Sequence, residues 1–203
     1  MKEGSINLKE YNYPLPDDRI AKHPLEKRDA SKLLHYQNGE ISHQQFSNIA
    51  DLIPNDSTLF FNNTKVIPAR IFLEKETGAK IEVFLLSPIA PSDIMSIVME
   101  ERNAVTWKCM IGNLKKWKEE SLKRKLVVNG LQTTLMASLI NRKSRTVTIE
   151  WDNPSISFAE IVEHAGHVPL PPYLNRNATD QDKPRYQTVY SEKEGAVAAP
   201  TAG

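Results

Sequence analysis

The chain has 203 residues, enough for one large domain or two small ones, and it is 40% hydrophobic and 25% charged, as ordinary soluble proteins are. No apolar run is long enough to cross a bilayer and the first residues lack the apolar core of a signal peptide, so we expect a cytoplasmic protein without a membrane span. The single cysteine, Cys109, excludes an internal disulfide and a multi-cysteine metal cluster.

The net charge of +1 conceals a strong segregation. Residues 102–145 hold 11 Lys and Arg against two acids, a charge of +9, which leaves −8 for the remainder. A basic block on an otherwise acidic chain is typical of a protein that binds a polyanion. The alternative is a solvated face that only keeps the protein soluble.

The first 65 residues indicate mixed α and β structure. Asn38-Gly39 is a strong turn signal and predicts a β-hairpin. Ser47 is placed to cap a short helix that Pro54 ends. The expected elements are a helix over 17–21, strands over 33–37 and 40–46, a helix over 49–53 and a strand over 58–62.

From Val66 onward, short strand patterns follow one another with turn signals between them, which predicts a small barrel or sandwich. Helical character returns over 157–164, where Ser157 and Glu160 have the spacing of a capping box. The expected strands cover 66–73, 80–86, 94–99, 105–111, 125–128, 131–137 and 145–151.

These patterns together predict a mixed α/β (α+β) chain. Residues 1–65 and 152–203 are expected to form one discontinuous α/β domain. Residues 66–151 are expected to form an inserted, β-barrel-like domain.

Polar side chains follow the strand expected at 58–62. Asn62 and Thr64 are candidate ligand contacts, because the ends of strands in open α/β sheets are common binding positions. An Asx-type turn that links two domains explains the amide side chains equally well. Lys65 and Arg70 are not needed for a turn, so we interpret them as binding residues.

The C-terminal part of the chain combines prolines, tyrosines and clustered charge. The prolines of the 169–172 segment could hold an extended strut that aims Tyr173, or could form a loop that another protein recognises. Tyr186 and Tyr190 are expected on one face of a strand, where they could stack a base beside Arg185.

The last nine residues, 195–203, have almost no side-chain volume. Such a run lets the main chain approach a ligand and offer its N–H and C=O groups, although a tightly packed turn is the alternative. His164 and His167 are more typical of a structural or solvent-facing pair than of a metal site. Cys109 lies in a strand pattern and is expected to be a small core residue.

Six motifs occur in a telling order: RDASKLL from residue 28, NNTKVIPAR from 62, GAKIEVFLL from 78, HVPLPPYLNR from 167, RYQTVY from 185 and GAVAAPTAG from 195. Over nearly the whole chain they resemble the S-adenosylmethionine:tRNA ribosyltransferase-isomerase family of queuosine biosynthesis. Asn63 stands where the family commonly has Asp, and Ala79 where a second Gly is usual.

The resemblance implies transfer and isomerisation of the ribosyl group of S-adenosylmethionine onto 7-aminomethyl-7-deazaguanine at the tRNA wobble position. Epoxyqueuosine forms, and adenine and methionine leave. S-adenosylmethionine is then a co-substrate and a tRNA anticodon stem-loop the partner, while no prosthetic group and no metal are implied. We expect a monomer. The family's pattern continues beyond Gly203, so we also expect this polypeptide to be inactive by itself.

The reaction needs a base, a nucleoside site and cations for tRNA phosphates. The candidates for proton transfer are His23, His167 and Asp182, and nothing in the sequence separates them. The expected substrate-binding residues are Asn62, Thr64, Lys65, Arg70, Tyr173, Arg176, Arg185, Tyr186, Gln187, Tyr190, Ala198, Pro200, Thr201 and Gly203. The expected tRNA-binding residues are Lys115, Lys116, Lys118, Lys123, Arg124 and Lys125.

Two other functions are compatible with the sequence. The chain could be a non-catalytic nucleic-acid-binding module that uses its basic block. It could also be a protein-interaction scaffold that uses the HVPLPPYL segment.

Overall fold

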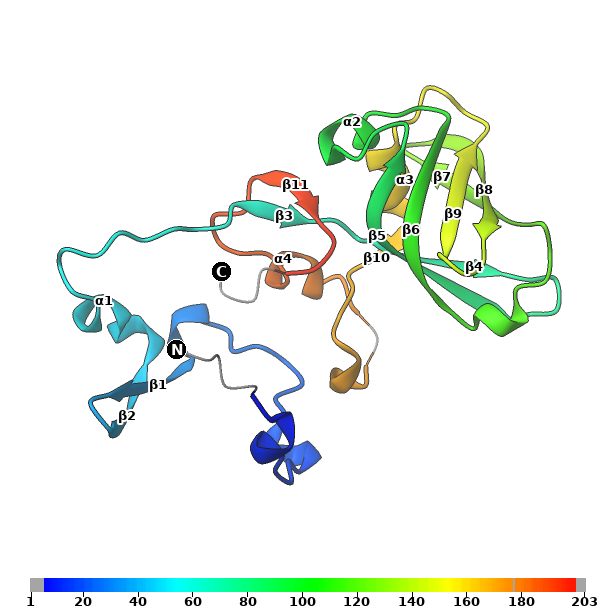
Figure 1. Ribbon diagram of the computed structural model, residues 1–203. Helices are drawn as coiled ribbons and strands as arrows, with labels where there is room; N and C mark the ends of the chain where they lie inside the picture. Colours follow the sequence, from blue (N-terminus) through cyan, green and yellow to red (C-terminus); the bar gives the residue numbers. More distant parts are fainter. Residues whose placement is uncertain (1–5, 177, 200–203) are drawn as a thin grey trace. The chain divides into compact units, whose positions relative to one another are not determined.

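A computed structural model describes residues 6–176 and 178–199 (Figure 1). The chain divides into two compact units. The first, called here the hairpin unit, comprises Met1–Thr58 with Pro171–Arg176, and the second, the barrel unit, comprises Leu59–Leu170 with Asn177–Gly203. The expected partition into an α/β domain and an insert stays a prediction.

Strands dominate the described residues. They are β1 (Lys32–Gln37), β2 (Glu40–Gln45), β3 (Thr64–Val66), β4 (Arg70–Glu74), β5 (Lys80–Ala90), β6 (Ala104–Gly112), β7 (Ser121–Val128), β8 (Leu131–Asn141), β9 (Thr146–Trp151), β10 (Gly166–His167) and β11 (Lys193–Ala196). The α-helices are α1 (Ile49–Leu52), α2 (Met95–Met99), α3 (Phe158–Ala165) and α4 (Asp182–Arg185). Single 3-10 turns lie at Leu8–Tyr11, Asp17–Arg19, Arg28–Ala30, Phe46–Asn48, Leu114–Lys116 and Pro172–Leu174. None of the described helices is long and apolar enough to cross a membrane.

The hairpin unit confirms the predicted turn. Strands β1 and β2 pair antiparallel around Asn38 and Gly39, whose φ angles of 51° and 89° suit a tight hairpin turn. No described side chain in this unit is buried, and Leu34, Tyr36 and Ile41 of the hairpin are each more than 60% exposed. The described residues of the hairpin unit therefore form no hydrophobic core, and the β1–β2 ladder and the hydrogen bond from Arg176 to the Lys22 carbonyl oxygen are among the contacts that hold them.

The barrel unit is built on a curled seven-stranded sheet with the order β10-β4-β5-β6-β9-β8-β7. Helix α3 supplies the other half of its core, because the Phe158 ring lies 5.8 Å from the rings of both Trp107 and Trp151. These side chains and the alternate residues of β5 and β8 are buried. The mixed α/β class and the barrel-like β domain are confirmed.

Strands β4 and β7 approach each other at the seam of the barrel, although they are not hydrogen-bonded neighbours in the described sheet. Arg124 bridges them. Leu122 and Leu126 of β7 are buried and Lys123 is exposed, and Arg124 points inward with the leucines. Its Nη1 donates to the carbonyl oxygens of Phe72 at 3.1 Å and Ala165 at 3.0 Å.

Helix α3 has a clear structural cause at each end: a capping box where it begins and a glycine where it ends. The capping box is confirmed: Ser157 Oγ accepts from the Glu160 N–H, and the Glu160 carboxylate accepts from the Ser157 N–H at 2.8 Å. At the other end only glycine fits at 166. A Cβ there would lie 1.8 Å from the Pro68 carbonyl oxygen and 2.5 Å from that of Val162.

Several expected elements are wrong in kind. The 94–99 segment forms helix α2 instead of a strand, since a short apolar run suits either and Ser92 Oγ accepts from the Ile94 N–H to start a turn. Ser47 lies inside the 3-10 turn before α1 and does not cap that helix. The 17–21 segment forms only a 3-10 turn, and 58–62 forms no regular element.

Candidate functional site

A cleft of about 630 Å³ lies in the barrel unit between β3, α3 and α4. Its floor is apolar, with Ile67 and Val162 among the side chains that form it. Its polar lining includes Lys65, His164 and Gln187. A partly apolar cleft with a few polar groups is the usual form of a small-molecule site. Lys65 and Gln187, both expected to bind substrate, are brought together here.

One wall of the cleft depends on a parallel pair of short strands, β3 and β11. Their ladder continues past β3, where the Ile67 N–H donates to the Ala196 carbonyl oxygen at 2.9 Å. Gly195 and Ala196, the first residues of the small-residue run, therefore belong to a β-strand. Ala198 is exposed, whereas Pro200, Thr201 and Gly203 lie outside the described residues.

Gln187 ties the segment after α4 to β3. Its side-chain Oε1 accepts from the Val66 N–H and its Nε2 donates to the Val66 carbonyl oxygen, both at 2.8 Å. The amide thus pairs with the backbone as another strand would. This clamp holds the neighbouring Lys65 at the cleft.

Lys65 is exposed and, among the described residues, its ammonium group forms no ion pair. The other ammonium group of the lining, that of Lys183, is 3.3 Å from Glu163 Oε1. Glu160 and Glu163 also line the cleft. Lys65 is the lining lysine that forms no ion pair among the described residues, so its ammonium group is suited to hold a carboxylate or phosphate group of a ligand.

His164, which was expected to belong to a structural or solvent-facing pair, is exposed and lines the cleft. Its ring Nδ1 lies 2.9 Å from the Glu160 carbonyl oxygen. Because a carbonyl only accepts, Nδ1 carries the proton, and Nε2 is the basic atom of the neutral ring. Any residue at position 160 would offer this carbonyl oxygen, so the sequence held no signal that His164 lines a cleft.

Four expected site residues have structural partners in the barrel unit. Asn62 Oδ1 accepts from the N–H of Thr64 at 2.9 Å and from its hydroxyl at 2.7 Å, which is the Asx-type turn. Arg70 forms a 2.9 Å ion pair with Glu82. Asp182 is buried and accepts from the N–H and hydroxyl groups of Thr179 at 2.7 and 3.0 Å.

The RYQTVY segment is not a strand. Arg185 is the last residue of α4, the Tyr186 N–H donates to the Asp182 carbonyl oxygen, and Thr188–Tyr190 form a turn. The Tyr190 ring makes an edge contact with Phe61 at 4.9 Å. The two tyrosines therefore do not share one strand face as expected.

The remaining candidates lie elsewhere. His23 and Tyr173 are exposed residues of the hairpin unit, in which Arg176 Nε donates to the Lys22 carbonyl oxygen at 2.8 Å. His167 is on β10 of the barrel unit, where its ring makes an edge contact with Phe72 at 5.2 Å.

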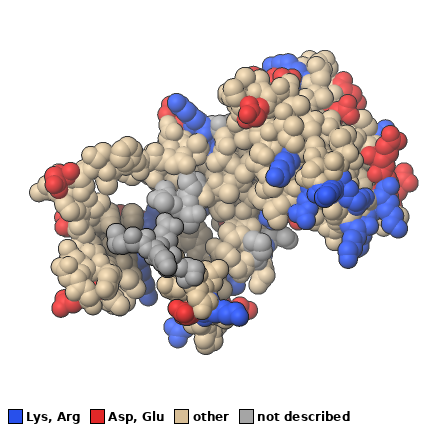
Figure 2. Space-filling view, in the orientation of Figure 1, with Lys and Arg blue, Asp and Glu red and all other residues tan. Residues whose placement is uncertain are grey.

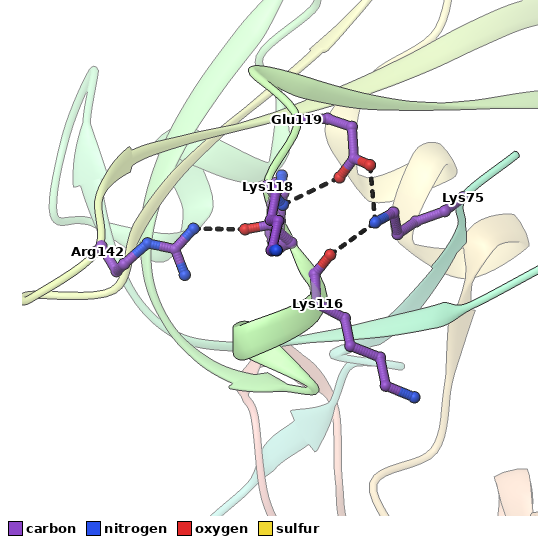
Figure 3. A network of polar contacts seen from close by, with 6 residues as sticks. Lys75, Lys116, Lys118, Glu119 and Arg142 are labelled. Carbon is purple, nitrogen blue, oxygen red and sulfur yellow. Dashed lines mark hydrogen bonds and ion pairs between the residues drawn. The ribbon is translucent and has the colours of Figure 1, made fainter. Parts of the chain in front are cut away.

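The loop at 113–119 carries part of the basic block and is held by Arg142 on one side and Lys75 on the other (Figure 3). Arg142 donates to the carbonyl oxygens of Leu114 and Trp117, and Trp117 is fully buried. Lys75 Nζ lies 2.7 Å from both the Lys116 carbonyl oxygen and Glu119 Oε1. The hydrogen bond from Lys75 lowers the pKa of Glu119.

This network leaves three lysines of the loop pointing to solvent. Lys115, Lys116 and Lys118 are exposed, and within the described chain none of their ammonium groups forms an ion pair. Figure 2 shows Lys and Arg side chains gathered over the barrel at the right of the view, with acidic side chains beside them. We call Lys115, Lys116 and Lys118 the loop lysines. Of the other expected tRNA contacts, Lys123 and Lys125 are exposed, whereas Arg124 serves the barrel seam.

A family model described as queuosine biosynthesis protein matches residues 8–203. The chain belongs to this family. The resemblance inferred from the motifs is thereby confirmed. Two proteins named S-adenosylmethionine:tRNA ribosyltransferase-isomerase, from Trichlorobacter lovleyi and Pelobacter propionicus, are each 36% identical over 198 residues.

The match covers 97% of this chain but only 52% and 53% of those two relatives, so the chain spans about half their length. No solved structure gives a significant match. Among the described residues, no group of three or more His, Cys, Asp or Glu side chains is arranged to hold a metal ion.

Proposed function

We propose that this protein transfers and isomerises the ribosyl group of S-adenosylmethionine onto 7-aminomethyl-7-deazaguanine at the tRNA wobble position, with release of adenine and methionine. The observation that carries the proposal is the family match over residues 8–203, together with the name of the two relatives. Action in the cytoplasm as a monomer belongs to the same proposal.

In this proposal the cleft between β3, α3 and α4 holds part of a substrate. The volume of about 630 Å³ lies within the range of small-molecule sites. Lys65 would pair with the carboxylate of S-adenosylmethionine, since the two groups carry opposite charges and the ammonium group forms no ion pair among the described residues.

The base that removes the proton beside the sulfonium stays open among several groups. Asp182 is already hydrogen-bonded to Thr179, which lowers its availability as a base. His164, with Nε2 as its basic atom, joins His23 and His167 as a candidate. The loop lysines would contact tRNA phosphates.

Adenine release from S-adenosylmethionine tests the function when tRNA carrying the 7-deazaguanine precursor is supplied. This chain would be compared with the same chain joined to the part of the Trichlorobacter lovleyi relative that lies outside the match, and with that relative as positive control. We expect release from the joined protein and none from this chain alone. If the relative releases adenine and the joined protein does not, the proposed function is wrong.

A Lys65→Gln change in the joined protein tests the role of the cleft. We expect the KM for S-adenosylmethionine to rise roughly tenfold, as for the loss of one charge-assisted hydrogen bond. Lys193→Gln is the matched control, because Lys193 lies on the neighbouring strand β11 outside the cleft. An equal rise in both variants would remove Lys65 from the substrate site.

A second candidate function is a non-catalytic nucleic-acid-binding module. The observation in its favour is the anchored loop that presents the loop lysines without ion-pair partners. It predicts that this chain binds an anticodon stem-loop tightly and that the joined protein still releases no adenine.

A further inference from the structure

A second pocket, of about 360 Å³, lies at the seam of the barrel where β4, β5, β7 and β10 come together. We call it the seam pocket. Its polar lining consists of Glu74, Lys80, Lys123, Arg124 and His167. Two lysines, one arginine and a histidine thus line the pocket together with a single carboxylate. Such a surplus of positive charge in a concave site favours an anion.

Arg124 supplies a fixed guanidinium group to the seam pocket. One terminal nitrogen, Nη1, is occupied by the carbonyl oxygens of Phe72 and Ala165, which fixes the plane of the guanidinium. Among the described residues no acidic side chain forms an ion pair with it. Desolvation lowers the pKa of Arg124. A partly desolvated cation that lacks a counter-charge gains most from a bound anion.

The other basic side chains of the seam pocket are placed by strand register. Lys80 is the first residue of β5 and stands opposite Glu74 across the β4–β5 ladder. Lys123 is exposed on β7 beside Arg124, and His167 lies on edge strand β10. They reach the seam pocket from three strands around the fixed guanidinium, as a tetrahedral anion with several oxygens requires.

We propose that the seam pocket binds one phosphate group of a polynucleotide backbone. The fork of Arg124 matches phosphate oxygens, and ammonium groups add charge without a fixed direction. The strand that carries Lys123 and Arg124 lies within the +9 segment, as the loop lysines do. That the polynucleotide is tRNA rests on the proposed function, whereas the binding of a phosphate group by the seam pocket does not.

The first test uses inorganic phosphate as the probe. The ring signals of His167, assigned with a His167→Gln variant, are followed by NMR while phosphate is added to the whole chain at constant ionic strength. We expect saturable shifts, and roughly tenfold weaker binding in Lys123→Gln and in Lys80→Gln, the equivalent of one charge-assisted hydrogen bond.

Lys125→Gln is the matched control for Lys123→Gln. Both lysines are exposed on β7 and both variants lose one positive charge, but only Lys123 lines the seam pocket. We expect Lys125→Gln to bind phosphate as the parent chain does. Equal weakening in the two variants, or no saturable shift of the His167 signals, would overturn the seam pocket, because diffuse attraction would then explain the binding.

The second test uses an anticodon stem-loop RNA between 50 and 200 mM salt. We expect Lys123→Gln to reduce the salt slope by about 0.9, the value for one phosphate contact. Lys32→Gln, which removes the charge of an exposed lysine of the hairpin unit, should leave the slope unchanged. RNA that binds without shifting the His167 signals would overturn a polynucleotide as the source of the phosphate. No RNA binding by the parent chain, with phosphate still bound, would instead count against tRNA as the partner.

Discussion

Removing the charge of the loop lysines tests how this protein holds RNA. In the triple Lys→Gln variant of Lys115, Lys116 and Lys118, the loop itself should remain in place. Its anchors are the buried Trp117 and the bonds of Arg142 to backbone oxygens, and none of these uses a side chain that is changed. The variant should therefore differ from the parent chain in charge and not in fold.

The magnitude follows from the number of exposed cations. If each loop lysine contacts one phosphate, the slope of log affinity against log salt falls by about 2.7 in the variant. Between 50 and 200 mM salt the parent chain should then lose affinity about 40-fold more than the variant does. Loss of only one contact would change the slope by about 0.9.

Fluorescence anisotropy of a labelled anticodon stem-loop, titrated at four salt concentrations, measures both slopes. A matched control replaces Lys9, Lys27 and Lys32, which are exposed residues of the hairpin unit, with Gln. The control loses the same charge, and we expect it to keep the parent slope. An unchanged slope in the loop variant, or an equal fall in the control, would refute the reasoning and make the basic loop a solubility feature.

Three further predictions concern stability. Gly166→Ala should lower the free energy of unfolding, measured by urea titration, by about 3 kcal/mol or more, because the new Cβ meets two backbone oxygens. Gly195→Ala is its control: the Cβ there makes only an ordinary 3.6 Å contact, so this change should be near neutral. Arg124→Met should cost about 1–3 kcal/mol by the same measurement, since two carbonyl oxygens at the barrel seam lose their donor; a cost no larger than that of Lys125→Met would contradict this. Burial raises the pKa of the Cys109 thiol from 9.0 to about 12, so the thiol ionises at lower pH in the unfolded chain than in the folded one. Between pH 9 and pH 12 the free energy of unfolding should therefore fall by about 1.4 kcal/mol per pH unit. The same fall in a Cys109→Ala chain would show that Cys109 does not cause it.

Local signals were reliable in this chain where neighbours in sequence settle the structure. The Asn38-Gly39 turn and the Ser157–Glu160 capping box each need only a few adjacent residues, and both were confirmed. The ordered motifs likewise indicated the family, which the match over residues 8–203 confirmed. Periodicity also predicted most strands of the barrel, since alternate burial leaves a period of two.

Contacts between distant segments decided the rest. The sequence places Lys123, Arg124 and Lys125 in one basic run, but strand alternation turns only Arg124 inward, where the carbonyl oxygens of β4 and α3 hold it. Gln187 was expected to meet a ligand; it lines the cleft, and its amide pairs with Val66, 121 positions away. No pattern of neighbours encodes either partner.

The sequence by itself determined the family, the mixed α/β class, the barrel-like strands and the basic block. Only the tertiary structure decided which cations of that block face solvent and which hold the barrel together. It also decided that Lys65, His164 and Gln187 line one cleft. The physical reason is that charge, turn chemistry and periodicity belong to the local chain, whereas the partner of a side chain depends on which segments the fold brings together.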